Sequence, residues 1–158
     1  MGTSQPLPQR RRPAEGVNII IGSQPTIVFL TICTKDRRPV LASAAVHGQL
    51  LKSWAAAQAW LVGRYVVMPD HLHLFAAPGP DALPLENWVR YWKSLFTRSC
   101  SVPGFAWQSG HWDRRLRNDE SYDQKWQYVL DNPVRHGLVR SSADWPFQGE
   151  LNELAWGG

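Results

Sequence analysis

Four apolar stretches of the chain have the length and composition of β-strands: residues 26–34, 61–68, 71–77 and 105–117. The first is a β-branched run after Pro25, which is typical of a strand buried on both faces. The second and third are separated only by Pro69 and Asp70, so a tight turn is expected to join them as a hairpin.

Three other stretches repeat their apolar residues at helical spacing and predict helices at residues 44–60, 85–100 and 122–131. The third helix has Ser121 at its start, a residue type that caps helix N-termini. The first two helices each carry one apolar stripe, formed by Val46, Leu50, Trp54, Ala57 and Leu61 in the first and by Leu85, Trp88, Val89, Trp92, Leu95 and Phe96 in the second.

The predicted order is strand, helix, strand, strand, helix, strand, followed by one more helix. This is the order of an α+β, ferredoxin-like split βαβ sandwich, in which helices pack on one face of an antiparallel sheet. The other face or an edge of that sheet would be left for a ligand, and the C-terminal helix would supply a catalytic residue. We expect one domain over residues 17–158, preceded by a flexible basic arm at residues 1–16 that contains Arg10, Arg11 and Arg12.

Composition adds few constraints. The 158 residues include 17 Lys and Arg against 13 Asp and Glu, for a net charge of +4, so an anionic partner is about as well supported as an ordinary basic protein. The cysteines, Cys33 and Cys100, do not suggest a disulfide framework, and a reducing cytoplasm is the default compartment. No apolar run is long enough to span a bilayer, so no membrane association is expected.

The stretch of greatest chemical interest is the third strand, which begins with His71, Leu72 and His73. Alternation along a strand places both imidazoles on one face, where they could share a divalent cation. Asn132, from the end of the third helix, could supply a third ligand if that helix packs beside the strand, and Gln124 and Asp131 are competing candidates. Such a set could hold Mg²⁺ or Mn²⁺.

Tyr128 lies one helical turn before Asn132 and is the candidate nucleophile. A cation nearby would polarise a phosphodiester oxygen, which a phenol with a pKa near about 10 needs in order to react at neutral pH. Tyr122 is the competing tyrosine, although it lies on another helix face. Tyr65 and Tyr91 sit in apolar patterns and are expected to be packing residues.

Basic side chains in two regions are candidate DNA contacts, with an ordinary solvated surface as the alternative: Arg114, Arg115 and Arg117, and on the second helix Lys93 and Arg98. On a strand, Arg115 and Arg117 would share one side and Arg114 would point to the other. His111 and His136 have no ligand-type partner at useful spacing and are expected to be surface residues or phosphate contacts.

Three strings of the sequence together resemble the REP-associated tyrosine transposases, a branch of the single-tyrosine HUH transposases. The strings are residues 65–75 (YVVMPDHLHLF), residues 112–118 (WDRRLRN) and residues 128–139 (YVLDNPVRHGLV). The resemblance implies a metal-dependent endonuclease and strand transferase that cleaves single-stranded or hairpin palindromic DNA through a 5′-phosphotyrosine. It assigns His71 and His73 to the metal, Tyr128 to the nucleophile and Asn132 to a third polar ligand.

The resemblance also implies a cytoplasmic bacterial protein that is nucleoid-associated when bound to DNA, and that acts as a monomer or a homodimer. A catalytically silent hairpin-DNA-binding protein derived from such a transposase is the alternative. A histidine-triad phosphohydrolase would require a further alternating histidine, and position 75 is Phe.

Overall fold

The computed structural model describes residues 26–117 and 120–154. The predicted N-terminal arm, with Arg10 to Arg12, lies outside the described residues. The described part contains five strands: β1 (Val28–Cys33), β2 (Trp60–Val67), β3 (His71–Pro78), β4 (Trp112–Arg115) and β5 (Gln148–Glu150). Its helices are α1 (Ala44–Ala55), α2 (Leu85–Ser99), α3 (Tyr122–Leu130) and the short α4 (Asn132–Arg135), with 3₁₀ turns at Lys35–Arg37 and Ser142–Asp144.

The five strands form one antiparallel sheet in the order β4-β1-β3-β2-β5. The first four strands with α1 and α2 have the element order and strand order of the ferredoxin-like sandwich, so the predicted fold class is confirmed. β3 is the central strand, and it pairs with β1 on one side and β2 on the other. The strand that begins with the two histidines is therefore fixed on both edges by backbone hydrogen bonds.

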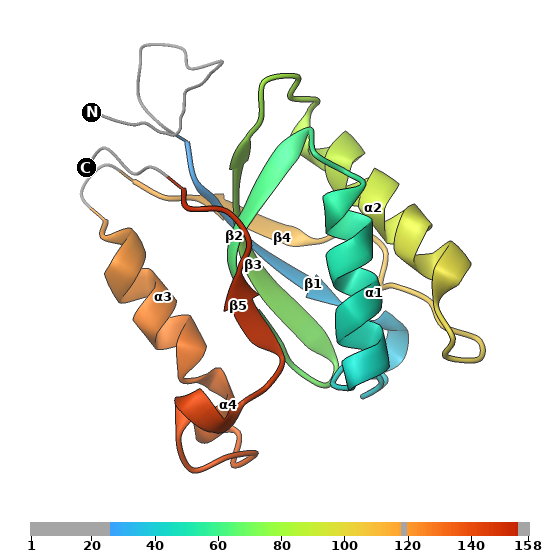
Figure 1. Cartoon of the computed structure of the whole chain (residues 1–158), viewed down its shortest axis with the longest axis vertical. Coiled ribbons are helices and arrows are strands. Elements are labelled where there is room, and N and C mark those ends of the chain that lie inside the picture. Colours follow the sequence, from blue (N-terminus) through green and yellow to red (C-terminus); the bar gives the residue numbers. More distant parts are fainter. Residues whose placement is uncertain (1–25, 118–119, 155–158) are drawn as a thin grey trace.

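Helices cover both faces of the sheet, in three layers (Figure 1). On one face α1 and α2 pack against Leu72, Leu74 and Ala76 of β3 in the larger core, and most of their predicted apolar stripes pack there. The exception is Leu61, which lies on β2 and packs against the core on the other face. On the other face α3 packs Tyr122 and Trp126 against Phe75. The prediction that helices pack on one face thus holds for α1 and α2, while α3 covers part of the opposite face.

The largest differences from the sequence-based prediction concern the end of the first helix, the extent of the fourth strand and one additional strand. The first helix ends at Ala55 instead of residue 60, because the Gln58 amide donates to the carbonyl oxygens of Trp54 and Ala55 and Trp60 already opens β2. The fourth strand is confined to Trp112–Arg115, and Gly104 and Gly110 adopt positive φ in the segment before it. Strand β5 was not predicted.

Within the described residues, no helix is long and apolar enough to cross a membrane.

Candidate active site

His71 and His73 occupy the start of β3 and lie on the sheet face that α3 partly covers, as strand alternation predicts. Their ring centroids are 4.9 Å apart. His71 is buried with 9% exposure, and the His73 ring stacks on Phe29 of β1 at 5.2 Å. The two imidazoles are therefore held side by side by the sheet and not by a loop.

Each histidine is anchored through the same ring atom. Nδ1 of His71 lies 2.7 Å from Oδ1 of Asp70, and Nδ1 of His73 lies 3.0 Å from Oγ1 of Thr31. A carboxylate only accepts, so His71 donates its Nδ1–H and keeps an unprotonated Nε2 when neutral. Within the described part of the chain no hydrogen bond to either Nε2 atom is found.

Burial keeps both imidazoles neutral near pH 7. Loss of solvation lowers the pKa of His71, an effect that Asp70 opposes, and it lowers the pKa of His73 to about 3, with nearby positive charge acting in the same direction. Burial works against ionisation of Asp70, but hydrogen bonds from His71 and Arg37 lower its pKa. A neutral imidazole beside an ionised orienting carboxylate is the form in which histidine binds metals.

Tyr128 and Asn132 lie at the junction of α3 and α4, and Arg135 links them. The Arg135 guanidinium stacks 4.1 Å from the Tyr128 ring centroid and donates to the Tyr128 carbonyl and to Oδ1 of Asn132, both at 2.9 Å. Tyr128 is 66% exposed, whereas Asn132 is buried with 8% exposure. The helix is interrupted at Asp131, so Asn132 starts a new short turn in place of continuing α3.

His136, which directly follows α4, connects this junction to the histidine pair. Its ring centroid is 6.5 Å from that of His71, and its Nδ1 lies 3.0 Å from the carbonyl oxygen of Asn132. His136 is exposed, as predicted. The α4 turn therefore brings the Asn132 end of the helix toward β3, while Gln124 lies exposed in the first turn of α3.

The tyrosines differ strongly in exposure. Tyr122 is 7% exposed, its hydroxyl accepts a hydrogen bond from the Arg64 backbone N–H at 3.1 Å, and burial raises its pKa. Tyr65 is buried, as predicted, and burial raises its pKa to about 12. Tyr91 is 49% exposed on α2, so its predicted packing role is wrong. Of the two tyrosines on α3, Tyr122 is buried and Tyr128 is exposed to solvent.

The three arginines near β4 do not form one continuous patch. Strand pairing sets Arg114 opposite Phe29, on the histidine face, and Arg115 opposite Val28, on the other face. Arg114 forms an ion pair with Glu120, whose pKa its hydrogen bond lowers to about 2. Arg115 and Arg117 are exposed at this edge of the sheet.

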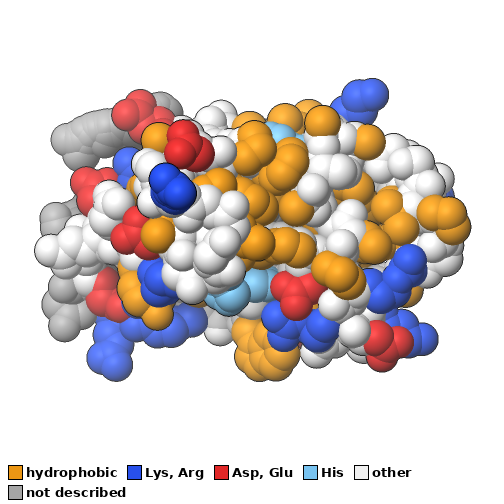
Figure 2. Space-filling view, turned by 90° about the horizontal axis from the view of Figure 1, so that it is seen from below, with side chains coloured by type: hydrophobic (Ala, Val, Ile, Leu, Met, Phe, Trp, Pro, Cys, Tyr) orange, Lys and Arg blue, Asp and Glu red, His pale blue; other side chains and the backbone are white. Residues whose placement is uncertain are grey.

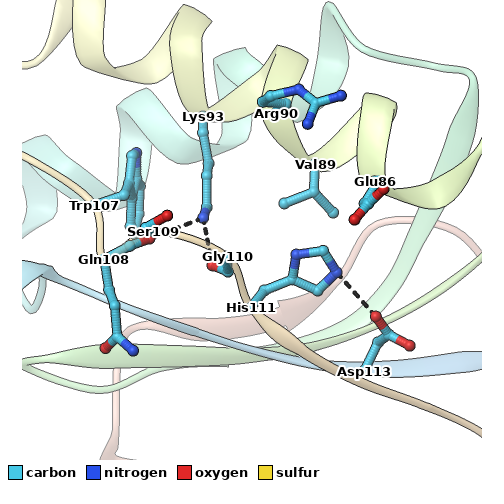
Figure 3. Close-up of a pocket in the computed structure, with 10 residues that line it drawn as sticks. All are labelled: Glu86, Val89, Arg90, Lys93, Trp107, Gln108, Ser109, Gly110, His111 and Asp113. Carbon is cyan, nitrogen blue, oxygen red and sulfur yellow. Dashed lines mark hydrogen bonds and ion pairs between the residues drawn. The ribbon is translucent and has the colours of Figure 1, made fainter.

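Lys93 lies in a cavity of about 420 Å³ between α2 and residues 107–113 (Figure 3). Its ammonium group donates to the carbonyl oxygens of Gln108 at 3.2 Å and Gly110 at 2.8 Å, and burial lowers its pKa. In the same cavity His111 pairs with Asp113 at 3.0 Å with its side chain only 8% exposed, so its predicted surface position is wrong. Arg98 is exposed near the end of α2.

Figure 2 looks onto the end of the molecule at which α4 lies in Figure 1. Histidine side chains reach the surface there, next to hydrophobic side chains, and side chains of both charges lie around them. The arrangement offers nitrogen ligands, apolar surface and charged groups on one face.

The donor set fits a weakly held divalent cation. Two imidazoles have oriented Nε2 atoms, and the Asn132 amide oxygen, already accepting from Arg135, retains a second lone pair. Within the described residues no group of three or more His, Cys, Asp or Glu side chains could hold a metal ion. A site of this kind would therefore depend on oxygen ligands from the Asn132 amide, water or the substrate phosphate to complete the coordination.

Similar proteins were found by sequence and by structure, while no family model matches the chain. A REP-associated tyrosine transposase of Escherichia coli K12 is 33% identical over 97 residues, which cover 61% of this chain and 58% of that protein. A relative from Haemophilus influenzae Rd that carries the same family name is 26% identical over 112 residues, 58% of this chain and 64% of its own length. The chain thus spans less than two thirds of the curated relatives that it matches.

Among solved structures, a REP-associated tyrosine transposase bound to a REP hairpin superposes with a TM-score of 0.65 at 26% identity, over 85% of this chain and 81% of that one. A structure from Deinococcus radiodurans shares the fold, with a TM-score of 0.52 and 19% identity over 74% of this chain and 96% of its own. The resemblance to REP-associated tyrosine transposases predicted from the sequence is confirmed.

Proposed function

We propose that this protein is a metal-dependent DNA endonuclease and strand transferase that cleaves hairpin or single-stranded palindromic DNA through a covalent bond to Tyr128. The observation that carries the proposal is the pairing of two neutral histidines, each anchored through Nδ1, with an exposed tyrosine on the adjoining helix junction. Hairpin DNA is the proposed substrate because the structural relative is bound to a REP hairpin.

In the proposed reaction, the Tyr128 hydroxyl oxygen attacks the scissile phosphorus. A phosphorus–oxygen bond to tyrosine forms and the bond to the 3′ oxygen breaks. The phenol loses one proton, and the departing 3′ oxygen gains one to become a 3′ hydroxyl. One phosphoester replaces another, so strand transfer needs no nucleotide cofactor. When bound, Mn²⁺ or Mg²⁺ would polarise the phosphodiester oxygen.

Other side chains of the junction have supporting roles in this proposal. Arg135 fixes the Tyr128 backbone and lies over the phenol ring, where its positive charge would stabilise the phenolate that forms on deprotonation. Asn132 and His136 lie on the same short turn as Arg135, and the His136 ring lies 6.5 Å from that of His71, so this turn would place polar groups beside the histidine pair.

Arg115, Arg117 and Arg98 are exposed and could contact phosphates, whereas Lys93 has two of its donors engaged by backbone carbonyls. We therefore rank Lys93 below the arginines as a DNA contact.

The test is formation of a covalent adduct. The protein is incubated with Mn²⁺ and a radiolabelled hairpin oligonucleotide that carries unpaired flanking nucleotides, and the products are separated on a denaturing gel. We expect a labelled protein band with the parent chain and none with Tyr128→Phe, because the phenol oxygen is the attacking atom.

Tyr91→Phe is the matched control, since Tyr91 is also exposed but lies on α2. An adduct that survives Tyr128→Phe would exclude Tyr128 as the nucleophile. Binding of the hairpin without any adduct in the parent protein would favour a catalytically silent DNA-binding protein.

A further inference from the structure

Trp112 is the exposed tryptophan among those that the structure describes, and the others are buried or half-buried. It is 61% exposed at the start of β4, whereas Trp54, Trp88 and Trp92 form the core under the opposite face. Single exposed aromatic side chains are common on protein surfaces and need no explanation in themselves. The position of Trp112 relative to the histidine pair is what distinguishes it.

Strand register places Trp112 in the same cross-strand row as the site. Trp112 of β4 pairs with Thr31 of β1, and Thr31 pairs with His73 of β3. Directly paired residues project to the same face of an antiparallel sheet, about 5 Å apart. Trp112 therefore lies on the histidine face about 10 Å from His73, beyond the Thr31 side chain that anchors it.

The histidine face is uncovered at the Trp112 end of β4, whereas Ile27 and Leu116 at the other end of this side are buried. The α3 side chains Tyr122 and Trp126 pack on Phe75, toward the other half of the sheet. Phe29, the neighbour of His73, is only half-buried, and β4 is the edge strand of the sheet. Exposed or half-buried rings therefore lie near the histidines at Phe29 and at the edge of the sheet at Trp112, with Thr31 between His73 and Trp112.

Positive charge lies close to this surface. Arg117 is exposed just after β4, and Arg37 lies beside His71, next to the row that contains His73. Arg115 is exposed on the same edge strand but on the opposite face of the sheet. A DNA strand whose phosphate lies at the histidines could reach Trp112 along this row. Arginine next to an exposed aromatic ring is the combination that binds unpaired nucleotides without requiring base pairing.

We propose that Trp112 is a stacking platform for an unpaired base of the bound DNA, close to the scissile phosphate. The inference rests on the proposed function for the identity of the substrate, and it makes Trp112 a positioning residue. Stacking on Trp112 would hold the single-stranded segment next to a hairpin stem so that its phosphate stays at the histidines.

The test uses binding without cleavage. Tyr128→Phe protein in the absence of divalent metal is titrated with a hairpin that carries five unpaired nucleotides, and with the same stem and loop made blunt. Each unpaired position in turn carries 2-aminopurine, whose fluorescence is quenched on stacking. Trp112→Ala, Trp112→Phe and Tyr91→Ala are compared in this background.

We expect Trp112→Ala to weaken binding of the flanked hairpin by about five- to 100-fold and to abolish quenching at one position. Binding of the blunt hairpin should not change, and Trp112→Phe should restore part of the affinity. Tyr91→Ala, which removes an exposed aromatic from α2, should bind both hairpins like its parent.

Salt dependence separates stacking from charge. The Trp112→Ala effect should be the same across salt concentrations, whereas Arg115→Gln with Arg117→Gln should reduce the slope of affinity against salt. The inference is overturned if Trp112→Ala binds and quenches like its parent, or if the parent binds neither hairpin. A failure to form the Tyr128 adduct would leave this binding result intact, so the two proposals fail separately.

Discussion

The Thr31 hydroxyl is hydrogen-bonded to Nδ1 of His73 and so orients this imidazole. The proposed metal affinity depends on that orientation. Thr31→Val keeps the shape of the side chain but removes the partner of the buried Nδ1 atom. Loss of such an orienting partner commonly lowers metal affinity by about 10- to 100-fold. We expect that loss for Mn²⁺ in isothermal titration calorimetry at pH 7.5.

Thr97→Val is the matched control for this substitution. Thr97 also uses its hydroxyl in one hydrogen bond, to the Lys93 carbonyl on the exposed side of α2, away from the histidines. Its replacement should leave Mn²⁺ affinity unchanged. Equal affinity in Thr31→Val and the parent would mean that His73 does not ligate the ion through Nε2.

For single residues, the sequence predicted positions that follow from spacing within one strand or helix. It missed contacts that depend on how two elements pair or pack. The shared face of His71 and His73 follows from strand alternation alone, and the preference for Tyr128 over Tyr122 follows from helix periodicity. Thr31 was missed because the register between β1 and β3 cannot be derived from either strand by itself. The position of His136 beside His71 could have been predicted from the sequence. His136 follows Asn132 by four residues, so a turn that brings Asn132 toward β3 brings His136 there too.

At the level of elements, Gly63 of β2 fixes how closely α3 can approach the sheet. A Cβ atom at this position would lie 2.6 Å from the Tyr122 hydroxyl and 2.6 Å from a methyl carbon of Leu154. The Tyr122 hydroxyl is held there by the Arg64 backbone N–H, at the irregularity in the β2–β3 pairing. α3 carries the proposed nucleophile, so this close approach positions the site.

We expect Gly63→Ala to destabilise the protein by about 1–3 kcal/mol, the usual cost of overpacking, as measured by urea unfolding. Gly48→Ala is the opposite case, because Gly48 lies inside α1 and a Cβ there meets nothing within 4 Å. Alanine should stabilise that helix by about 0.5–1 kcal/mol. If the two substitutions changed the free energy of unfolding equally, tight packing at Gly63 would not determine how closely α3 approaches the sheet.

Element prediction succeeded where one segment carried its own pattern. The apolar stripe of α2, the Val46, Leu50 and Trp54 part of the stripe of α1, and the Ser121 cap of α3 appear where the sequence placed them. Strand β5 has no such pattern, with Gly149 in its middle, and it exists because Gln148 and Glu150 pair with the edge of β2. The end of α1 was misplaced because a side-chain amide of Gln58 stops the helix without Pro or Gly.

At the scale of the whole molecule, the three-layer arrangement buries neutral histidines between the sheet and the α3–α4 junction. Burial lowers the pKa of His73 to about 3, whereas the unfolded chain has the ordinary value near 6.5. Between these two pH values His73 is protonated in the unfolded chain and neutral in the folded protein. The contribution of His73 to the free energy of unfolding is therefore full above about pH 6.5 and falls as the pH decreases toward 3. His71, whose pKa is also lowered, acts in the same direction.

From this shift we expect the free energy of unfolding of the metal-free protein to fall by roughly 2 kcal/mol between pH 7.5 and pH 5 on account of His73 alone. Urea unfolding in the presence of a chelator at both pH values measures the loss. His73→Phe keeps a ring against Phe29 but cannot take up a proton, so its stability should depend less on pH over this range. An unchanged pH dependence in His73→Phe would show that protonation of other groups, and not of the buried pair, drives acid unfolding, and it would remove the physical basis for a neutral imidazole ligand at this position.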